Sequence, residues 1–460
     1  MEYVIGVLLL MSFFALVVYA VRGGNLMLGM FVMASLWTLL PLIGNALVRN
    51  PAFIAANFTG SGGSIVKLSV SEALGKVFQQ GPEGWGSVMV NVLFGAWFGR
   101  ALLQTGIAST LIRKTVELGG DKPAIVAVLL SIVTTAIFSG MFGAGAVVAI
   151  GVIILPILIS LGIPKQTAIV SFMFSVGAGM LINPVLTKQF IGFFLDNNGK
   201  ELFTYAQHVR FGLIAVGIQL LTTIAYIIFA LRPKRRVHTW SVQNPKKTSV
   251  DFVPNIALIS PVIPVVLLIV LKAPIILGFI SGSLFALLAC GKLKSWRGAA
   301  RMIAKDFYDG VVDTAPLLAF LLVVPMFNKA SELCVPYFKV LLGNIIPTNP
   351  LIISAAFVLL APLGLFRGPL TLYGGGVATL GILKSIGFLS PQYIPYLFTM
   401  MIVSTTVMNV SACVTQSWVA WGIGYTKVSG REYLKSSLPL GWITCAILQV
   451  VNFILYGMTR

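Results

Sequence analysis

The sequence FSGMFGAG at residues 138–145 decides how the rest of the chain is interpreted. It interrupts an apolar run that otherwise has the composition of a membrane-spanning helix, and the run resumes behind it. A second, polar break follows at Asn183 and Pro184. A related stretch, FRGPLTLYGGG at residues 366–376, is followed by Asn409 and a polar cluster. Interrupted helices at corresponding places in two halves of a chain are typical of binding sites in secondary transporters.

The composition indicates an integral membrane protein. Of the 460 residues, 57% are hydrophobic and only 10% are charged, whereas charged residues make up about 25% of ordinary soluble domains. Apolar runs of about 18 residues or more recur along the chain, and each is long enough to cross a bilayer as a helix. The 32 Lys and Arg residues outnumber the 13 Asp and Glu residues and lie in short loops, as is typical of cytoplasmic loops. We therefore expect a multi-pass protein of the cell membrane, in contact with lipid and not with nucleic acid.

Missing motifs exclude several classes of function. The four cysteines, Cys290, Cys334, Cys413 and Cys445, show no CxxC or Cys/His spacing, so neither disulfides nor a zinc site is expected. A nucleotide-binding GxxxxGK[ST] motif is absent. Uphill transport would then draw on an ion gradient and not on ATP. No cofactor is expected, and no metal beyond Na⁺ as a candidate coupling ion.

The apolar runs of the first half differ in kind. Plain spans are expected at about residues 4–21, 26–47, 85–100 and 208–231. Residues 105–119 place apolar side chains among polar ones at helical spacing, which predicts an interfacial arm, and residues 71–80 are expected to form another interfacial helix. Residues 123–161 form two limbs of roughly 16 residues, marginal for full crossings, so we expect a re-entrant hairpin. Residues 166–195 contain Asn183 and Pro184, which predicts a discontinuous helix.

The second half repeats the first after a basic linker at residues 232–253. The motif FQQG at residues 78–81 matches FYDG at an offset of 229 (307 − 78), and FGR at residues 98–100 matches FNK at the same offset. FSG at residues 138–140 matches FRG at an offset of 228 (366 − 138), and Asn183 is paired with Asn409. The sequence therefore predicts an all-α polytopic membrane protein of two inverted repeats, each with about five transmembrane helices, one re-entrant hairpin and one interfacial arm helix.

The basic residues give the expected orientation. If the linker is cytoplasmic, the same side also holds Arg22, Lys165 and the basic segments at residues 292–305 and 427–435. The sparse or mixed loops fall on the other side. This agrees with an inverted repeat and places both termini outside the cell.

The order of spans, arm, hairpin and discontinuous helix resembles the ion transporter superfamily, which includes the gluconate permease family, the divalent anion/sodium symporters, citrate transporters and anaerobic C4-dicarboxylate carriers. The resemblance covers nearly the whole chain. It is carried by Gln104-Thr105-Gly106 at the start of the arm, the hairpin tips at residues 139–145 and 367–376, and the paired breaks at Asn183 and Asn409.

The resemblance implies a homodimer in which a transport domain holding both hairpins slides against a static scaffold. Residues 1–121 and 254–348 would then be the scaffold parts of the two repeats. Residues 122–231 and 349–460 would be the transport parts, joined through the cytoplasmic linker at residues 232–253.

A helix broken inside a membrane exposes backbone groups: its N-terminal N–H groups attract anions, and its unwound carbonyls bind cations. Arg367 at the second tip and Lys188 after the first break are costly at membrane depth, so they are expected to hold an anion. Alternatively, either side chain reaches water or neutralises a helix C-terminus. The candidate substrate-binding residues are Arg367, Lys188, Ser139, Gly140, Asn183, Thr371, Asn409, Thr415 and Gln416. The candidate coupling-ion residues are Ser139, Gly143, Gly145, Asn183, Thr187, Gly374, Gly375, Asn409 and Ser411. For the small residues, close helix packing is the alternative explanation.

The acidic residues favour an anion as the substrate. Only Asp313 falls in an expected span, at its start, and neither proposed site contains a carboxylate, which a cation/proton antiporter would need. Arg100 and Lys329, matched between the repeats, are expected to anchor helix ends at the membrane interface. His208, at the end of a span, is not a convincing proton relay.

These observations favour a secondary active transporter of a small organic anion, a carboxylate or a sugar acid, coupled to Na⁺ or H⁺. The resemblance implies an elevator-type motion. We expect the first break to favour the coupling cation and the second the anion. The alternative is a cation/proton antiporter or exporter of the same fold. The duplicated hairpins disfavour a channel-like pore, and an enzyme is disfavoured because no nucleophile, metal cluster or acid pair stands at membrane depth.

Overall fold

The computed structural model describes residues 1–460 except residues 23, 52, 54–68, 121, 197–198, 233–252, 343–347, 385–387, 389 and 459–460. The described residues form helices and no β-strand, only an isolated bridge between Leu195 and Glu201. Eight of the described helices are long and apolar enough to cross a membrane, and up to ten spans result if each bent helix pair counts as one. The prediction of an all-α polytopic membrane fold is confirmed. Most of the predicted linker at residues 232–253 lies outside the described residues.

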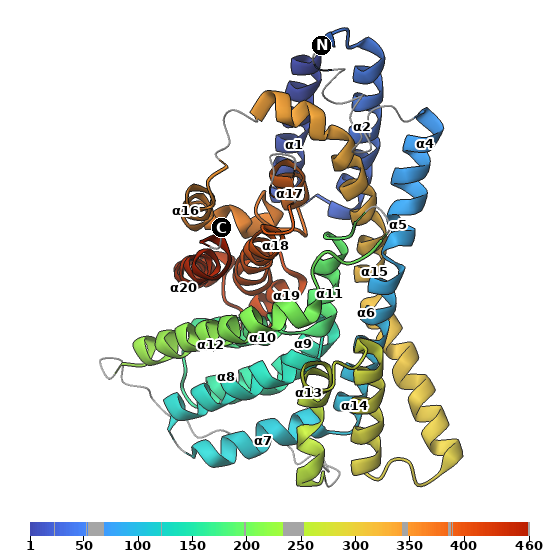
Figure 1. The fold of residues 1–460 in the computed structure, drawn as a ribbon. Coiled ribbons are helices and arrows are strands. Elements are labelled where there is room, and N and C mark those ends of the chain that lie inside the picture. The colour runs from blue at the N-terminus through green and yellow to red at the C-terminus, as the bar shows by residue number, and fades with distance from the viewer. Residues whose placement is uncertain are drawn as a thin grey trace.

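One side of the molecule is a layer of long helices, called here the long-helix layer (Figure 1). Its members are α1 (Glu2–Val21), α2 (Leu26–Leu47), α4 (Val70–Leu74), η2 (Gly75–Gln80), α5 (Gly81–Gly84), α6 (Gly86–Gln104), η3 (Asn255–Val262), α13 (Ile263–Val270), α14 (Ile275–Ala289) and α15 (Trp296–Leu342). With 47 residues, α15 is long enough to pack on α2 near one end and on α6 near the other.

The helical run at residues 70–104 differs from the expectation. The prediction of a separate interfacial helix at residues 71–80 is wrong, because one helix of 35 residues continues from Val70 to Gln104. The run begins with a capping box, in which Ser69 and Glu72 satisfy each other's backbone N–H groups. Pro82 does not end the run, because it stands in the first turn of α5 directly after the π-helical turn η2, where a missing N–H costs little.

The predicted arm after Gly106 is present as a helix. Gly106 has a φ of +73°, a left-handed conformation that favours glycine, and it separates α6 from α7 (Ile107–Gly119). The new helix runs across the direction of α6 and packs on α8 (Figure 1). Its position at a membrane surface stays a prediction.

Two glycines show that α5–α6 and α15 are related by the repeat. The ideal Cβ position of Gly81 is 3.2 Å from the carbonyl oxygen of Pro325, and that of Gly310 is 3.0 Å from the nitrogen of Trp97 and 3.3 Å from the oxygen of Ala96. Adding 229 to 81 gives 310, and adding 229 to 96 gives 325, so each contact maps onto the other. The two helices run in opposite directions (Figure 1). A pseudo-twofold relation of this kind is what an inverted repeat requires.

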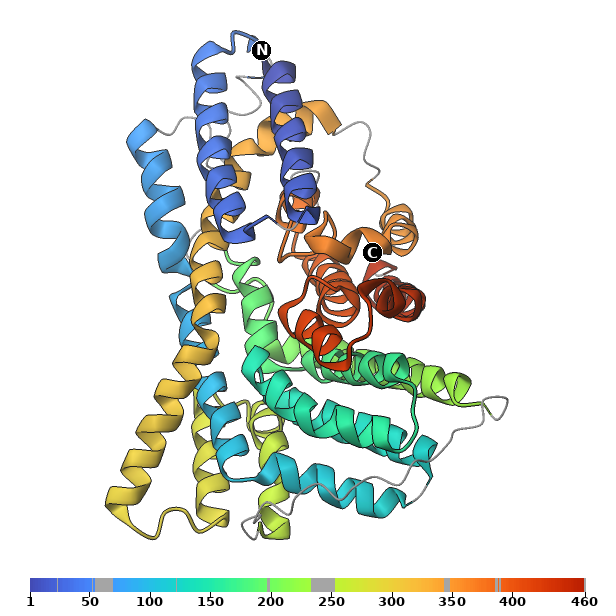
Figure 2. The same cartoon turned by 180° about the vertical axis from the view of Figure 1, so that it is seen from behind.

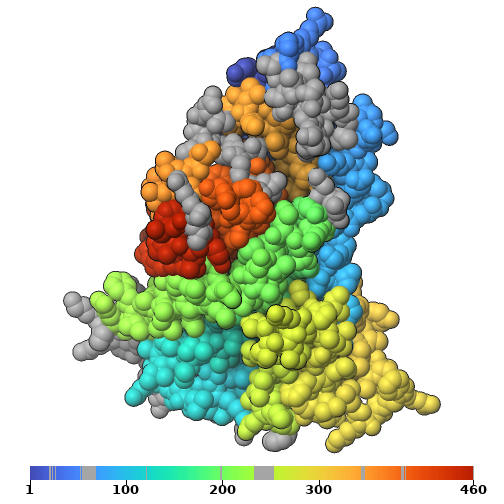
Figure 3. Space-filling view, viewed as in Figure 1, coloured from blue at the N-terminus to red at the C-terminus, as the bar shows by residue number. Residues whose placement is uncertain are grey.

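The other side of the molecule is a bundle made of two similar halves (Figures 1 and 2). The first half contains α8 (Pro123–Gly140), α9 (Ala144–Ser160), α10 (Lys165–Met180), α11 (Pro184–Gly192) and α12 (Tyr205–Ala230). The second half contains α16 (Pro350–Leu359), η4 (Ala361–Arg367), α17 (Gly376–Leu383), α18 (Ile394–Val403), η6 (Ser404–Ala412), α19 (Ser417–Thr426), α20 (Gly430–Asn452) and η7 (Phe453–Gly457). Figure 3 shows the second half, orange to red, stacked on the first, teal to green. The division into a moving and a static part stays a prediction.

Each half of the bundle contains a hairpin. The side chain of Thr135 in α8 donates a hydrogen bond of 3.1 Å to the carbonyl of Ser175 in α10, and both helices end near the same place. Because α8 and α10 pack directly on each other and run parallel, α9, which connects them in the chain, must run back in the opposite direction. The first tip, residues 141–143, joins α8 to α9, and the second tip, residues 365–375, begins in the non-helical end of η4 and leads to α17.

Each half also contains a broken helix, but the second break lies later than predicted. In the first half, α10 and α11 are bent by 65° around residues 181–183, and Asn183 is the N-cap of α11. In the second half, Asn409 is inside η6, and the break is at residues 413–416. The N-cap that corresponds to Asn183 is Gln416, at an offset of 233 (416 − 183). The predicted pairing of Asn183 with Asn409 is therefore wrong.

The change of register has a local cause. The residues before α9 and α17 are Gly143 and Gly375, at an offset of 232 (375 − 143), whereas the long-helix layer keeps an offset of 229. The second tip is longer than the first, so the helices behind it are displaced along the sequence. A sequence comparison that assumes a constant offset cannot find this insertion.

Candidate functional site

A cavity of about 470 Å³ lies where the long-helix layer meets both hairpin tips. Its walls come from the start of α2, the first tip, α11, the middle of α15, the second tip and the start of α19. Apolar side chains line most of it, including Phe142, Leu317, Phe320, Tyr373 and Trp418. Its two charged lining residues are Arg367 and Asp313. The cavity thus offers one guanidinium and one carboxylate in a mostly apolar space, with Asn25, Thr314, Gln416 and Ser417 as its neutral polar side chains.

Arg367 points its guanidinium at neutral groups. Its Nη1 donates to the carbonyl oxygen of Tyr373 and its Nη2 to Oε1 of Gln416, both at 3.3 Å. The guanidinium carbon is 5.9 Å from the ring centroid of Phe320, within the range of a cation–π contact. Within the described part of the chain, no carboxylate lies within 4 Å of Arg367. A partly buried cation with only neutral partners is suited to bind an anion.

The backbone of the second tip is unusual at the same place. Phe366 and Arg367 have φ values of +52° and +59°, in the left-handed region that residues with side chains rarely adopt. Such strain persists only where the surroundings impose it, and it is frequent at functional sites. The N–H of Gly375 donates to the Arg367 carbonyl at 3.0 Å, and Gly374 lies directly against that carbonyl. Gly374 and Gly375 therefore close the tip around Arg367 and do not line the cavity.

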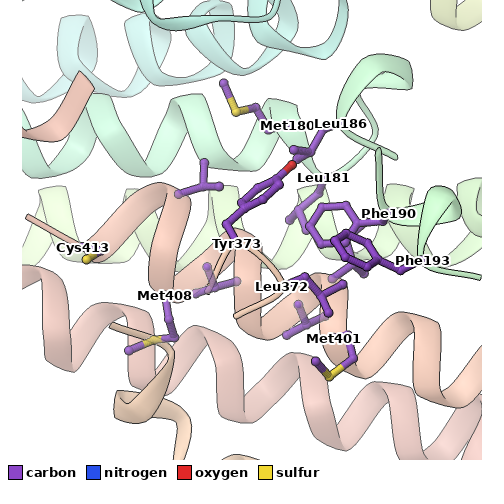
Figure 4. Close-up of a cluster of buried hydrophobic side chains, with 14 of the residues drawn as sticks. Met180, Leu181, Leu186, Phe190, Phe193, Leu372, Tyr373, Met401, Met408 and Cys413 are labelled. Carbon is purple, nitrogen blue, oxygen red and sulfur yellow. The ribbon is translucent and has the colours of Figure 1, made fainter. Parts of the chain in front are cut away.

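Tyr373 ties the second tip to the first half of the bundle. Its hydroxyl donates to Oε1 of Gln189 at 2.6 Å, and its ring centroid is 5.7 Å from that of Phe190. Figure 4 shows this apolar cluster, in which Leu181, Leu186, Phe190 and Phe193 of the first half lie beside Leu372, Tyr373 and Met401 of the second. The two halves of the bundle are thus one packed unit at the cavity.

Asn183 is saturated by the protein itself. Its Nδ2 donates to the carbonyl oxygens of Phe138 and Met141, both at 2.9 Å. Its Oδ1 accepts from the backbone nitrogens of Val185 at 2.9 Å and Leu186 at 3.3 Å. The side chain is completely buried. Asn183 therefore joins the first tip to the first break and has no amide group left for a ligand.

Of the other residues predicted for the first site, some line the cavity and others lie outside it. Gly143 lines the cavity, whereas Ser139 donates to the Ala136 carbonyl at 2.7 Å outside it. Position 140 requires glycine, because the carbonyl oxygen of Pro261 in η3 occupies the position that a Cβ atom would take. Close packing, the alternative explanation, thus accounts for Gly140.

Lys188 lies outside the cavity as well. It forms an ion pair with Glu201, and its side chain is only 15% exposed. Glu201 therefore neutralises the positive charge of Lys188, and Lys188 does not lie at the cavity that Arg367 lines.

Of the residues predicted for the second site, too, some line the cavity and others lie behind it. Gln416 lines the cavity next to Arg367, but Ser411 accepts from Nε2 of Gln219 at 3.0 Å behind it, and Thr415 contacts the thiol of Cys413. Thr187 and Thr371 have buried hydroxyls, and Asn409 a buried amide, that find no partner in the described part of the chain. These three residues do not line the cavity. They are the candidates whose polar groups are still free for an ion.

Sequence reasoning missed the ion pair between Arg100 and Asp313. Arg100 donates from Nε to Oδ2 and from Nη2 to Oδ1 of Asp313, both at 2.6 Å. Asp313 was expected at the start of a span, and this expectation is wrong, because α15 begins at Trp296 and Asp313 lies well inside it. The expectation that no carboxylate stands at the site is wrong for the same reason. The expected anchoring of Arg100 at the membrane interface stays a prediction. Neither residue carried a local signal, because 213 residues separate them.

Two residues of α12 support the first break and were also missed. The hydroxyl of Tyr205 donates to the carbonyl of Ile182 at 2.7 Å, and Nε2 of His208 donates to the carbonyl of Leu181 at 2.8 Å. Both side chains are buried. They satisfy carbonyl groups that a broken helix leaves without intrahelical partners. His208 thus lies in the first turn of α12, at the end of a candidate span as expected, and supports the break.

Comparisons with known proteins show a similarity in fold and none in sequence family. No family model and no curated protein sequence matches this chain. Among solved structures, the YdaH transporter of Alcanivorax borkumensis, whose crystal structure is described as having an unusual topology, is similar to it with a TM-score of 0.59. The match covers 93% of this chain and 99% of that chain at 16% sequence identity. The chain therefore shares the fold of that protein. Membership of the ion transporter superfamily stays a prediction.

Proposed function

We propose that this protein is a secondary active transporter of a small organic anion. The observation that carries the proposal is Arg367, which lies at a strained hairpin tip, faces the cavity and has no carboxylate partner in the described part of the chain. A cavity at the meeting point of two broken halves is where transporters with inverted repeats bind their substrates. The structural likeness to a transporter supports the same class.

The lining of the cavity narrows the chemical class of the substrate. One guanidinium suits a single carboxylate, and the aromatic residues Phe142, Phe320, Tyr373 and Trp418 suit an apolar body. A sugar acid would bury many hydroxyl groups against apolar surface, and each unsatisfied group would cost about 1–3 kcal/mol. A monocarboxylate with an apolar body is therefore favoured over a sugar acid.

Coupling to Na⁺ or H⁺ and an elevator-type motion belong to the same proposal. Support for an ion comes from the buried unpartnered groups of Thr187, Thr371 and Asn409. Support for a moving bundle comes from Tyr373, whose hydrogen bond to Gln189 joins the two halves of the bundle at the cavity. A homodimer, the cell membrane as location, a cytoplasmic linker and outward termini are further parts of the proposal.

Uptake of labelled carboxylates into proteoliposomes tests the proposal. Benzoate, octanoate, succinate and gluconate, with inward Na⁺ or H⁺ gradients, form a suitable panel. We expect saturable uptake, which Arg367→Gln abolishes and Arg367→Lys weakens about 10- to 100-fold in KM, because lysine cannot make two parallel bonds to a carboxylate. Lys188→Gln is the matched control, because its charge is paired with Glu201 outside the cavity. Full uptake by Arg367→Gln would refute the assigned role.

A cation/proton antiporter is the second candidate, because Asp313 places a carboxylate at the cavity. That carboxylate is already neutralised by Arg100, which weakens its attraction for a cation. Na⁺-dependent acidification of proteoliposomes without any organic solute would favour this candidate over the first.

A further inference from the structure

The first hairpin tip is held between α6 and α15 at the ion pair of Arg100 and Asp313. The ideal Cβ position of Gly145 is 2.7 Å from Oδ2 of Asp313, so the carboxylate lies directly against the first turn of α9. Gly143 lies beside Thr314, with 3.8 Å between its ideal Cβ and the methyl group of that residue. No residue larger than glycine fits at position 145 without moving the ion pair.

Asp313 has positive charge on two sides. One side is Arg100, which belongs to the long-helix layer as Asp313 does. The other side is the N-terminus of α9, whose first N–H groups have no intrahelical partner and form the positive end of the helix dipole. The side chains of Arg100 and Asp313 are 28% and 23% exposed, so water and salt screen them less than a pair on the open surface. The layer thus presents a fixed negative charge to a helix of the bundle.

Because the chain is an inverted repeat, the positions of Arg100 and Asp313 can be compared with the related positions in the other repeat. The residue related to Arg100 is Lys329 (329 − 229 = 100), and the residue related to Asp313 is Gly84 (313 − 229 = 84). Both line a second crevice, of about 320 Å³, between the layer and the end of α11. Lys329 is bound there to Glu332 of its own helix, at 3.0 and 3.2 Å. The carboxylate that faces a hairpin is therefore present at only one of two symmetry-related positions.

We propose that Asp313, held by Arg100, positions the first hairpin tip against the long-helix layer in one state of the transport cycle, and that this state is preferred when no anion is bound. In a transporter with inverted repeats, the two halves exchange roles between the two states. The second state then brings the bundle to Lys329 and Gly84, where position 84 has no side chain and the carboxylate of Glu332 is bound to Lys329. The inference rests on the proposed function, because it requires the bundle to move.

The same geometry links the tip to the substrate. Asp313 lines the cavity together with Arg367, so an organic anion in the cavity lies within reach of the same helix N-terminus. The anion competes with Asp313 for the positive end of α9. Binding therefore weakens the hold on the tip and favours the transition.

Distance measurements between spin labels test the inference without any substrate. Labels at Val90 of α6 and Ile125 of α8, both exposed, report the position of the first hairpin relative to the layer in a variant without the four native cysteines. We expect one dominant distance in the otherwise unsubstituted protein. Asp313→Asn keeps the shape of the side chain and removes its charge, and we expect it to raise the population of a second distance about tenfold, which corresponds to about 1.4 kcal/mol.

Two further variants make the experiment decisive. Arg100→Gln lies outside the cavity and should shift the distances in the same direction, which keeps the test valid if Asp313→Asn does not fold. Lys329→Gln is the matched control and should leave the distances unchanged. Unchanged distances in both Asp313→Asn and Arg100→Gln, or an equal shift in Lys329→Gln, overturn the inference. Absence of uptake by the unsubstituted protein refutes transport itself, whereas normal uptake with unchanged distances refutes only the role of Asp313.

Discussion

Asn183 and Asn409 look equivalent in the sequence, but the structure predicts opposite consequences when each is replaced by alanine. Asn183→Ala removes four hydrogen bonds of a completely buried side chain. Loss of the helix N-cap costs roughly 1 kcal/mol. The two carbonyls left unsatisfied cost about 1–3 kcal/mol each. The total, about 3–7 kcal/mol, is a large part of the stability of a typical domain.

Asn409→Ala should behave differently when no ligand is present. Both amide atoms of Asn409 are buried without a partner in the described part of the chain, so the substitution removes no hydrogen bond. It also removes the cost of burying an unpaired amide, about 1–3 kcal/mol. We therefore expect unchanged or slightly raised stability in a buffer without Na⁺ and without organic anions.

Thermal unfolding in detergent, followed by tryptophan fluorescence, compares the two variants. Asn183→Asp is the control, because it keeps the acceptors that cap α11 but has no donors for the two carbonyls. It should lower the unfolding temperature at least as much as Asn183→Ala. The reasoning is refuted if Asn409→Ala destabilises the ligand-free protein as strongly as Asn183→Ala. If Na⁺ stabilises the unsubstituted protein and not Asn409→Ala, the free amide is part of the ion site.

Three further substitutions test the packing around the site. Gly140→Ala should destabilise the protein by more than 1 kcal/mol, because a carbonyl oxygen of η3 occupies the position of the new methyl group. Gly86→Ala is the control: it has open space around it and should be neutral or stabilising in the same unfolding assay. His208→Phe should destabilise the first break by about 1–3 kcal/mol, because a buried carbonyl loses its donor; an unchanged unfolding temperature would contradict the capping role. Lys188→Gln and Glu201→Gln should show a coupling energy in a double-mutant cycle and leave the KM for uptake unchanged, and a raised KM would place Lys188 in the substrate site.

Local features of the sequence were sufficient for the architecture. Membrane spans depend on the length and composition of apolar runs, and helix breaks depend on glycine, proline and capping residues, all of which are read from neighbouring positions. The repeat was also visible in the sequence, because Gly81 and Gly310 stand in the matching motifs FQQG and FYDG. The structure adds that both glycines lie against the backbone of the other helix. Arg367 could be selected as a site residue because a charge at a glycine-rich break is costly unless it has a function.

The partners of the polar side chains were decided only by the tertiary structure. Lys188 and Arg367 are both basic residues next to a predicted helix break. Lys188 forms an ion pair with Glu201, whereas Arg367 contacts only neutral groups. The sequence around each residue does not show this difference, because other segments supply the partners. Asp313 reaches the cavity only because α15 passes beside α6 and the first tip. The sequence by itself therefore determined that each half contains a helix break, whereas the place of the second break came only from the structure. The packing of helices from both repeats decided which polar groups are already satisfied and which remain free to bind a ligand, because hydrogen bonds and ion pairs depend on distances across the fold and not along the chain.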